Sequence, residues 1–121
     1  MNVILWIVQG LLVLVFGFSA IVKGTQSTQR AVELGMTGVA DVPLRLMRFI
    51  AACEVLGVIG LVLPYATGIL PVLTPLAAVG LGMILVPAAG IHLRRREPLT
   101  AMGNVVLLGL CVFVAIGRWP T

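Results

Sequence analysis

Hydrophobic residues along this chain gather into four long runs, which short polar segments separate. The runs cover residues 3–22, 49–63, 73–91 and 102–117. The hydrocarbon core of a bilayer needs roughly 17–25 helical residues, so each run can cross it when flanking residues join the helix. Backbone groups inside lipid have to bond to one another, and the alternating pattern of a β-barrel is missing here, so the runs predict helices. We therefore expect an all-α membrane protein, a four-transmembrane-helix antiparallel bundle in one domain over residues 1–121, with spans at about 3–23, 46–63, 73–91 and 101–117.

The composition agrees with this interpretation. Of the 121 residues, 60% are hydrophobic and 10% are charged. A soluble domain carries about 25% charged residues, so a water-soluble core is not expected. No basic residue precedes the first run, and its length of about twenty residues exceeds the roughly 7–15 of a signal peptide, so this run is expected to be a retained span. Gly57 and Gly60 in the second run predict close packing against a neighbouring helix.

Basic residues are divided unequally between the two sides of the predicted bundle. Seven of the eight lysines and arginines lie after span one or after span three: Lys23, Arg30, Arg45, Arg48, Arg94, Arg95 and Arg96. Only Arg118 falls on the other side. Basic loops stay in the cytoplasm, so loops 24–45 and 92–100 are expected there and both termini are expected to be extracytoplasmic. These residues flank spans and are not interleaved with aromatic residues, so we expect the lipid bilayer as the partner. Nucleic-acid binding is not expected.

The first loop is the one long connection, and it contains a local helix pattern. The segment TQRAVELG, residues 28–35, predicts a short amphipathic helix with Ser27 as its cap and Gly35 as its stop. Proline positions predict breaks in the spans. Pro64 is expected to end the second span, and Pro87 is expected to kink the third because proline removes a backbone hydrogen bond.

The second run contains one strongly polar side chain, Glu54. It lies six residues beyond Arg48, or ~9 Å along a helix that rises ~1.5 Å per residue, so it falls in the cytoplasmic half of the membrane. Residues six apart occupy different faces of a helix, so Arg48 is not expected to pair with it. A carboxylate at this depth needs a partner on another helix or a water-filled cavity, and such residues are functional-site candidates.

Three residues from the other spans are candidate partners of Glu54. Lys23 ends a mildly polar face of the first span that includes Ser19, His92 closes the third span, and Asn104 begins a polar stripe on the fourth. In an antiparallel bundle Lys23, Glu54, His92 and Asn104 converge from four helices, with Lys23 as the counter-ion. Each residue also has a structural alternative: an interfacial anchor for Lys23, a headgroup-level position for His92, a helix–helix hydrogen bond for Asn104, and an internal salt bridge for Glu54.

Other kinds of chemistry find little support in the sequence. Cys53 and Cys111 are single thiols within spans, so dithiol chemistry in this chain is not expected. The sequence has no nucleophile elbow, phosphate loop or paired-histidine motif, so no metal site is expected. The single histidine excludes the usual bis-histidine haem.

Several segments taken together resemble the DoxX-like family of small bacterial membrane proteins. They are GFSAIVKG at the end of the first span, CEVLGVIGLVLP in the second, the GILPVLTPLAAVGL hairpin, GIHLRRRE, and the last span led by Asn104. The resemblance covers nearly the whole chain. It implies a four-helix bundle in the bacterial inner membrane, with Lys23, Glu54, His92 and Asn104 at the recurring polar positions of the family. It also implies an association with quinone-linked redox complexes.

The first functional hypothesis is an accessory or binding protein of the membrane. It would hold a small lipophilic ligand such as a quinone, or a redox partner protein, at the polar cluster. The second is a membrane enzyme in which Glu54 is the general acid or base and His92 or Lys23 assists. The third is a proton-coupled small-molecule transporter. It would require a homodimer, because a bundle of four helices is small to enclose a transport pathway. The sequence does not name the ligand, and whether the protein is an enzyme stays open.

Overall fold

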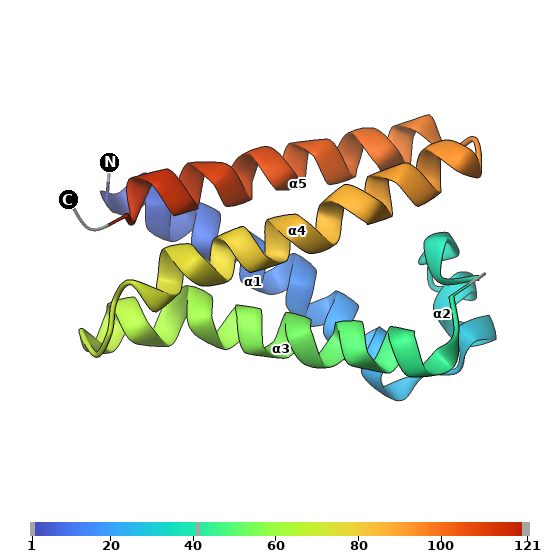
Figure 1. Cartoon of the computed structure of the whole chain (residues 1–121), viewed down its shortest axis with the longest axis horizontal. Coiled ribbons are helices and arrows are strands. Elements are labelled where there is room, and N and C mark those ends of the chain that lie inside the picture. Colours follow the sequence, from blue (N-terminus) through green and yellow to red (C-terminus); the bar gives the residue numbers. More distant parts are fainter. Residues whose placement is uncertain (1, 41, 120–121) are drawn as a thin grey trace.

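The computed structural model describes residues 2–40 and 42–119 and consists of helices and their connections in this part of the chain. Figure 1 shows the arrangement. The elements are α1 (Asn2–Thr25), α2 (Thr28–Glu33), the 3-10 helix η1 (Thr37–Val39), α3 (Leu44–Thr67), α4 (Leu73–Arg94) and α5 (Pro98–Gly117). The four long helices confirm the predicted all-α bundle, since each is long and apolar enough to cross a membrane.

The short helix in the first loop is confirmed together with its cap. The side chain of Ser27 accepts a hydrogen bond from the backbone N–H of Arg30, at 3.1 Å, at the start of α2. Gly35, just after α2, has a φ of +102°, which is a conformation that residues with a side chain rarely adopt. The cap and the glycine thus set the two ends of α2, as the sequence pattern predicts.

The prediction that Pro64 ends the second span is wrong. Helix α3 continues through Pro64 to Thr67 and ends at Gly68, which has a left-handed φ of +73°. One proline removes a single backbone hydrogen bond, whereas ending the helix inside lipid would leave several backbone groups without partners. Near its end, the hydroxyl of Thr67 also donates to the Leu63 carbonyl, at 2.6 Å.

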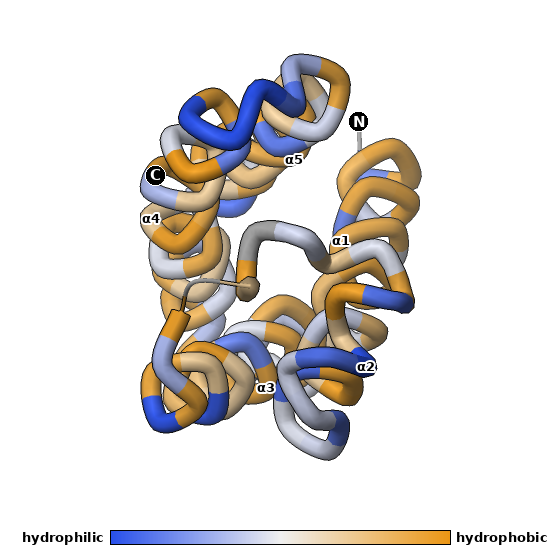
Figure 2. Tube along the Cα trace, turned by 90° about the vertical axis from the view of Figure 1, so that its right-hand side faces the viewer, coloured by the Kyte–Doolittle hydropathy of each residue, from blue (hydrophilic) through white to orange (hydrophobic). Residues whose placement is uncertain are grey.

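The long helices form a ring in the order α1, α3, α4 and α5. Helix α3 packs against both α1 and α4, and α4 packs against α5 over most of its length, while the contact between α1 and α5 is the least extensive of the four. The start of α1 and the end of α5 lie at one end of the bundle, the terminal end, and α2 lies at the other, the loop end (Figure 1). Seen from the loop end, the segment of α2 and η1 crosses in front of the ring (Figure 2).

Two hydrophobic clusters hold these elements together. The larger lies inside the ring and includes Leu12, Phe16, Leu61, Leu81 and Val114 among its buried members. The smaller consists of Val22, Ala31, Val39 and Met47, which come from α1, α2, η1 and α3 in turn. The first cluster fills the interior of the bundle, and the second attaches the first loop to α1 and α3.

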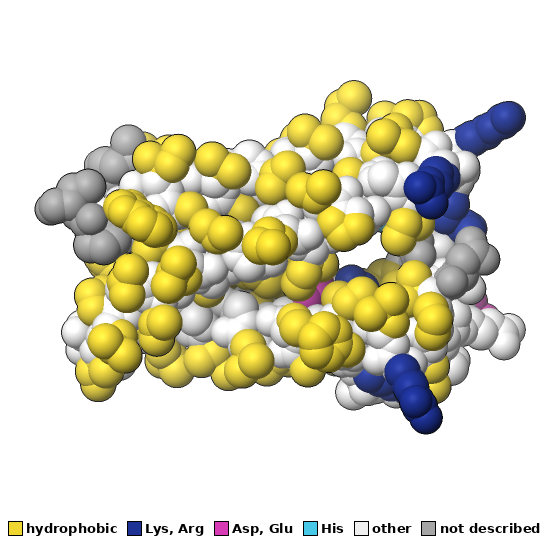
Figure 3. Space-filling model, viewed as in Figure 1, with side chains coloured by type: hydrophobic (Ala, Val, Ile, Leu, Met, Phe, Trp, Pro, Cys, Tyr) yellow, Lys and Arg dark blue, Asp and Glu magenta, His cyan; other side chains and the backbone are white. Residues whose placement is uncertain are grey.

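The outer surface of the bundle is apolar. Large hydrophobic side chains remain exposed on every long helix; examples are Leu14 at 71%, Leu56 at 70%, Met83 at 69% and Ile116 at 73%. Figure 3 shows hydrophobic side chains over the length of the helices and basic side chains at the loop end. A surface of this kind does not persist in water but suits lipid, so the protein is a multi-pass membrane protein embedded in a bilayer.

Close helix packing at Gly60 leads to the first prediction. A Cβ added there would lie 2.7 Å from the Cβ of Ala77 on α4, and neither atom can rotate away. We expect Gly60→Ala to destabilise the bundle by about 1–3 kcal/mol, because α3 and α4 would have to separate. The measurement is the fraction folded in a titration with sodium dodecyl sulfate. The control is Gly17→Ala, which meets no atom within 4 Å and should be neutral or slightly stabilising. Equal losses in both variants would contradict the prediction.

Candidate functional site: a buried ion pair between two spans

Glu54 lies almost completely enclosed in the middle of α3, with 2% of its surface exposed. The Lys23 Nζ atom of α1 is 3.5 Å from its Oε1 atom. The hydroxyl of Ser19 shares its proton between the two carboxylate oxygens, at 3.1 Å from each. The ion pair is therefore supported by a hydrogen bond, as a buried charge requires.

The spacing along α1 explains why these groups meet. Ser19 and Lys23 are four residues apart, so they occupy one face of the helix. Lys23 is mostly enclosed as well, with 17% of its side chain exposed. The structure thus brings together Lys23 and Glu54, which the sequence proposed as partners, and adds Ser19.

Arg48 is the basic residue nearest to Glu54 along the chain, and it has a different role. Its Nη1 atom donates to the backbone carbonyls of Lys23, at 2.7 Å, and Gln26, at 2.9 Å. These carbonyls belong to the end of α1, where the last backbone acceptors have no partner within the helix. Arg48 therefore caps α1 and leaves Lys23 as the counter-ion of Glu54.

His92 belongs to a second polar cluster at the loop end. Its Nδ1 atom is 3.0 Å from Oε1 of Glu97, and the hydroxyl of Thr37 in η1 donates to Oε2 of the same carboxylate, at 2.6 Å. Arg95 Nε also lies 3.5 Å from Glu97. His92 is thus engaged with the turn between α4 and α5, and its partner there is not Glu54. Through Thr37, this cluster ties the first loop to the second.

The pKa of Glu97 leads to a prediction about pH. The hydrogen bonds from Thr37 and His92 lower the pKa of this carboxyl below its ordinary value of 4.5, and the charges of His92 and Arg95 lower it further. A lowered pKa in the folded state stabilises the fold above pH 4.5, and this stabilisation disappears as the pH falls through the folded value. We expect the melting temperature of the wild type to exceed that of Glu97→Gln at neutral pH and the difference to vanish on acidification. A difference independent of pH would contradict this.

Asn104 stands apart from both clusters. It is half-buried on α5, six residues from the start of the helix, and thus ~9 Å along its axis. Its Nδ2 atom is enclosed and has no hydrogen-bond partner within the described part of the protein. A buried donor without a partner is costly, and a ligand can relieve that cost.

Sequence reasoning missed a polar centre at the terminal end. The side chain of Arg118, which follows α5, is 94% enclosed and donates from Nε to Oε1 of Gln9, at 2.8 Å, and from Nη1 to Oδ1 of Asn2, at 2.7 Å. Gln9 in turn donates to the Leu61 carbonyl, at 2.6 Å. The available indication was Gln9 itself, a lone amide within an apolar span.

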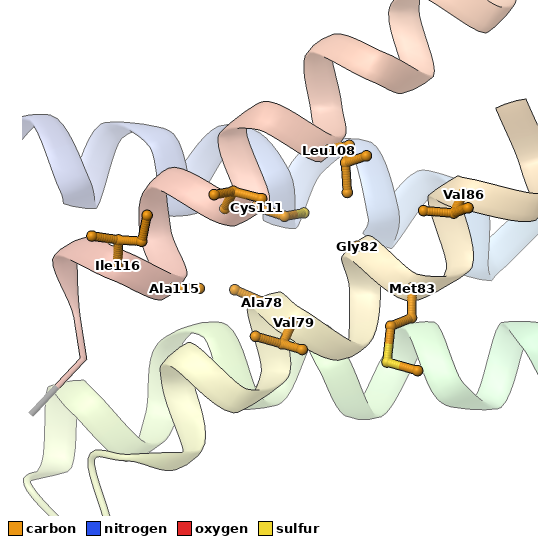
Figure 4. Close-up of a pocket in the computed structure, with 10 residues that line it drawn as sticks. Ala78, Val79, Gly82, Met83, Val86, Leu108, Cys111, Ala115 and Ile116 are labelled. Carbon is orange, nitrogen blue, oxygen red and sulfur yellow. The ribbon is translucent and has the colours of Figure 1, made fainter.

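A groove between α4 and α5, of about 300 Å³, has an entirely apolar lining (Figure 4). Gly82, Ala78 and Ala115 form its small-residue part, and Leu108 and Ile116 are among its larger side chains. It contains none of the polar residues described above. The groove suits the hydrocarbon chain of a lipid, and we assign no chemistry to it.

The fold and the buried ion pair define a class, a small multi-pass membrane bundle with a charged centre between two of its spans. A family model described as the DoxX-like family matches residues 7–114, so the chain belongs to that family. No curated protein matches the chain. No solved structure matches it either.

Proposed function

We propose that this protein is an accessory membrane protein that holds a small lipophilic ligand, such as a quinone, beside the ion pair of Lys23 and Glu54. The observation that carries the proposal is the burial of this pair in the loop-end half of the bundle. Glu54 is 2% exposed and lies in a membrane-spanning helix, where a charged side chain is costly and therefore marks a candidate functional site. Membership of the DoxX-like family supports a small integral membrane protein and leaves its ligand open.

The donors near this half of the bundle suit a ligand with carbonyl oxygens. Lys23 is 3.5 Å from one oxygen of Glu54, and an ammonium group has three N–H donors, so it has N–H groups to spare. Asn104 offers an Nδ2 donor without a partner. A quinone presents two carbonyl acceptors on an apolar ring and would supply two-electron redox chemistry when bound. Lys23 would therefore be the donor at the ion pair, and Asn104, on α5, would be the second donor if the ligand reaches across to it.

The shape of the bundle supports lateral access from the membrane. Figure 3 shows an opening between α3 and α4 toward the loop end, with acidic and basic side-chain atoms at its edge. The surrounding surface is hydrophobic, so a lipophilic molecule could reach the opening without crossing water. This feature favours a ligand drawn from the bilayer over a polar metabolite.

The enzyme hypothesis has less support. It assigns proton transfer to Glu54 with His92 or Lys23 assisting. Lys23 does lie beside Glu54, but the described contacts of His92 are to Glu97 at the loop end. A redox partner protein, a homodimer, an inner-membrane location and extracytoplasmic termini remain predictions from the sequence.

A titration with a short-chain ubiquinone tests the proposal and gives the third prediction. We expect Asn104→Leu to bind about threefold to tenfold more weakly than the wild type, the effect of one lost hydrogen bond, with no loss of stability because the amide Nδ2 has no partner to lose. Calorimetry on the purified protein in detergent measures both affinities.

The matched control is Met102→Leu on the same helix, at a position that is 61% exposed toward lipid. It should bind like the wild type. Absence of saturable binding to the wild type would contradict the choice of a quinone. Equal binding by the wild type and Asn104→Leu would remove Asn104 from the site.

A further inference from the structure

The guanidinium of Arg118 is a buried cation whose described contacts are all neutral. It donates to the amide oxygens of Gln9 and Asn2, and its Cζ atom lies over the rings of Tyr65, at 4.0 Å, and Trp6, at 5.1 Å. These contacts come from α1 and α3. They fix the position of the charge, but none of them neutralises it.

No carboxylate in the described part of the chain is available to Arg118. Three acidic residues are described there, and each pairs elsewhere: Glu33 with Arg30, Glu54 with Lys23, and Glu97 with His92 and Arg95. Glu33 and Glu97 also lie at the loop end, on the far side of the bundle. A buried cation without a counter-ion is unfavourable, so an anion from outside would stabilise this arrangement.

Two polar atoms at the terminal end lack a hydrogen-bond partner. One is Nη2 of Arg118, and the other is the hydroxyl oxygen of Thr74, which is 0% exposed. Thr74 lies 20 residues before Arg94, where α4 ends, and Arg118 lies 20 residues after Pro98, where α5 begins. Both are therefore ~30 Å from the turn that joins the two antiparallel helices, which places them at one level of the membrane.

We propose that the terminal end of the bundle binds one phosphate group, with Arg118 as its cation and Thr74 as a second donor. A guanidinium matches the oxygens of a phosphate, and it has donors to spare here. Trp6 and Tyr65 mark this level as the membrane interface, where lipid phosphates are concentrated. Nη2 and the Thr74 hydroxyl are both enclosed, so the phosphate reaches them only after it displaces the exposed Asn2 from Nη1. This proposal is independent of the ligand proposed at Glu54.

The fluorescence of Trp6 provides a local measurement. Of the two tryptophans in this sequence, Trp119→Phe leaves Trp6, whose ring lies against the guanidinium of Arg118. The probes are phosphatidylglycerol, diacylglycerol with the same acyl chains, and inorganic phosphate. We expect a saturable change with phosphatidylglycerol and none with diacylglycerol. Basic residues at the loop end also attract anionic lipid, but they lie far from Trp6. A similar change with inorganic phosphate would assign the site to free phosphate as well as to the lipid headgroup.

A second variant separates binding from folding. Gln9→Glu places a carboxylate at the position that now accepts from Nε of Arg118, so it supplies an internal counter-ion. We expect this variant to fold and to bind phosphatidylglycerol at least tenfold more weakly. Arg45→Gln, an exposed position at the loop end, should leave the Trp6 response unchanged. The proposal is overturned if diacylglycerol gives the same response as phosphatidylglycerol, if no phosphate probe changes the fluorescence, or if Gln9→Glu binds like the wild type.

Discussion

Lys23→Met is expected to destabilise the bundle by about 3–5 kcal/mol, because it leaves Glu54 enclosed without its counter-ion. Methionine keeps the apolar stem of lysine and removes the charge. The contact to Ser19 remains, but one hydroxyl does not balance a carboxylate in a membrane-spanning helix. Titration with sodium dodecyl sulfate, with the fraction folded as the readout, measures the loss.

Two further variants test whether this loss comes from the ion pair. Lys23→Met combined with Glu54→Gln should recover most of the stability, since no uncompensated charge is left. Arg30→Met removes one partner of an exposed pair, with side chains that are 56% and 52% exposed, and should cost less than about 1 kcal/mol. A double variant as unstable as Lys23→Met alone would contradict the ion-pair explanation.

Gln9→Leu is expected to cost about 2–4 kcal/mol at the opposite end of the bundle. The substitution removes the acceptor of Arg118 Nε and the donor to the Leu61 carbonyl, so a buried cation and a buried carbonyl each lose a partner. Gln9 is 0% exposed, so water does not replace either contact. Thermal melting in detergent provides the comparison.

The matched variant for this position is Gln9→Glu. It keeps an acceptor for Arg118 and adds a negative charge, while it loses the donor to Leu61. Its cost should therefore be clearly smaller than that of Gln9→Leu. If the two variants have the same melting temperature, the hydrogen bond to Arg118 contributes little to stability.

The fold was largely predictable from the sequence because the bilayer imposes simple rules. Apolar runs of sufficient length predicted the four spans, and the pair of Ser27 and Gly35 predicted α2. Pro64 did not predict the end of α3 correctly, because a proline costs one backbone hydrogen bond whereas an earlier end of the helix would have broken several. Helix order in the ring does not follow from such patterns, since every span is apolar on most of its surface.

The polar residues were predictable only where helical spacing determines their neighbours. Ser19 and Lys23 share one face of α1, so a meeting with Glu54 followed from depth and face. The contacts of His92 depend on the fold of the turn that holds Glu97, and this turn has no such periodicity. Arg118 follows the last helix, and its approach to Gln9 depends on how α1 and α5 meet at the terminal end.

Native mass spectrometry on gently extracted protein tests the central claim most directly, with Glu54→Gln and the exposed Glu33→Gln beside the wild type. We expect one lipophilic molecule to accompany the wild type and Glu33→Gln and to be missing from Glu54→Gln. That result would make the carboxylate part of a binding centre and would identify the ligand by mass. If all three samples are equally assembled and carry no bound molecule, the proposed binding role of Glu54 is contradicted. Glu54 is then a structural residue whose ion pair holds α3 to α1.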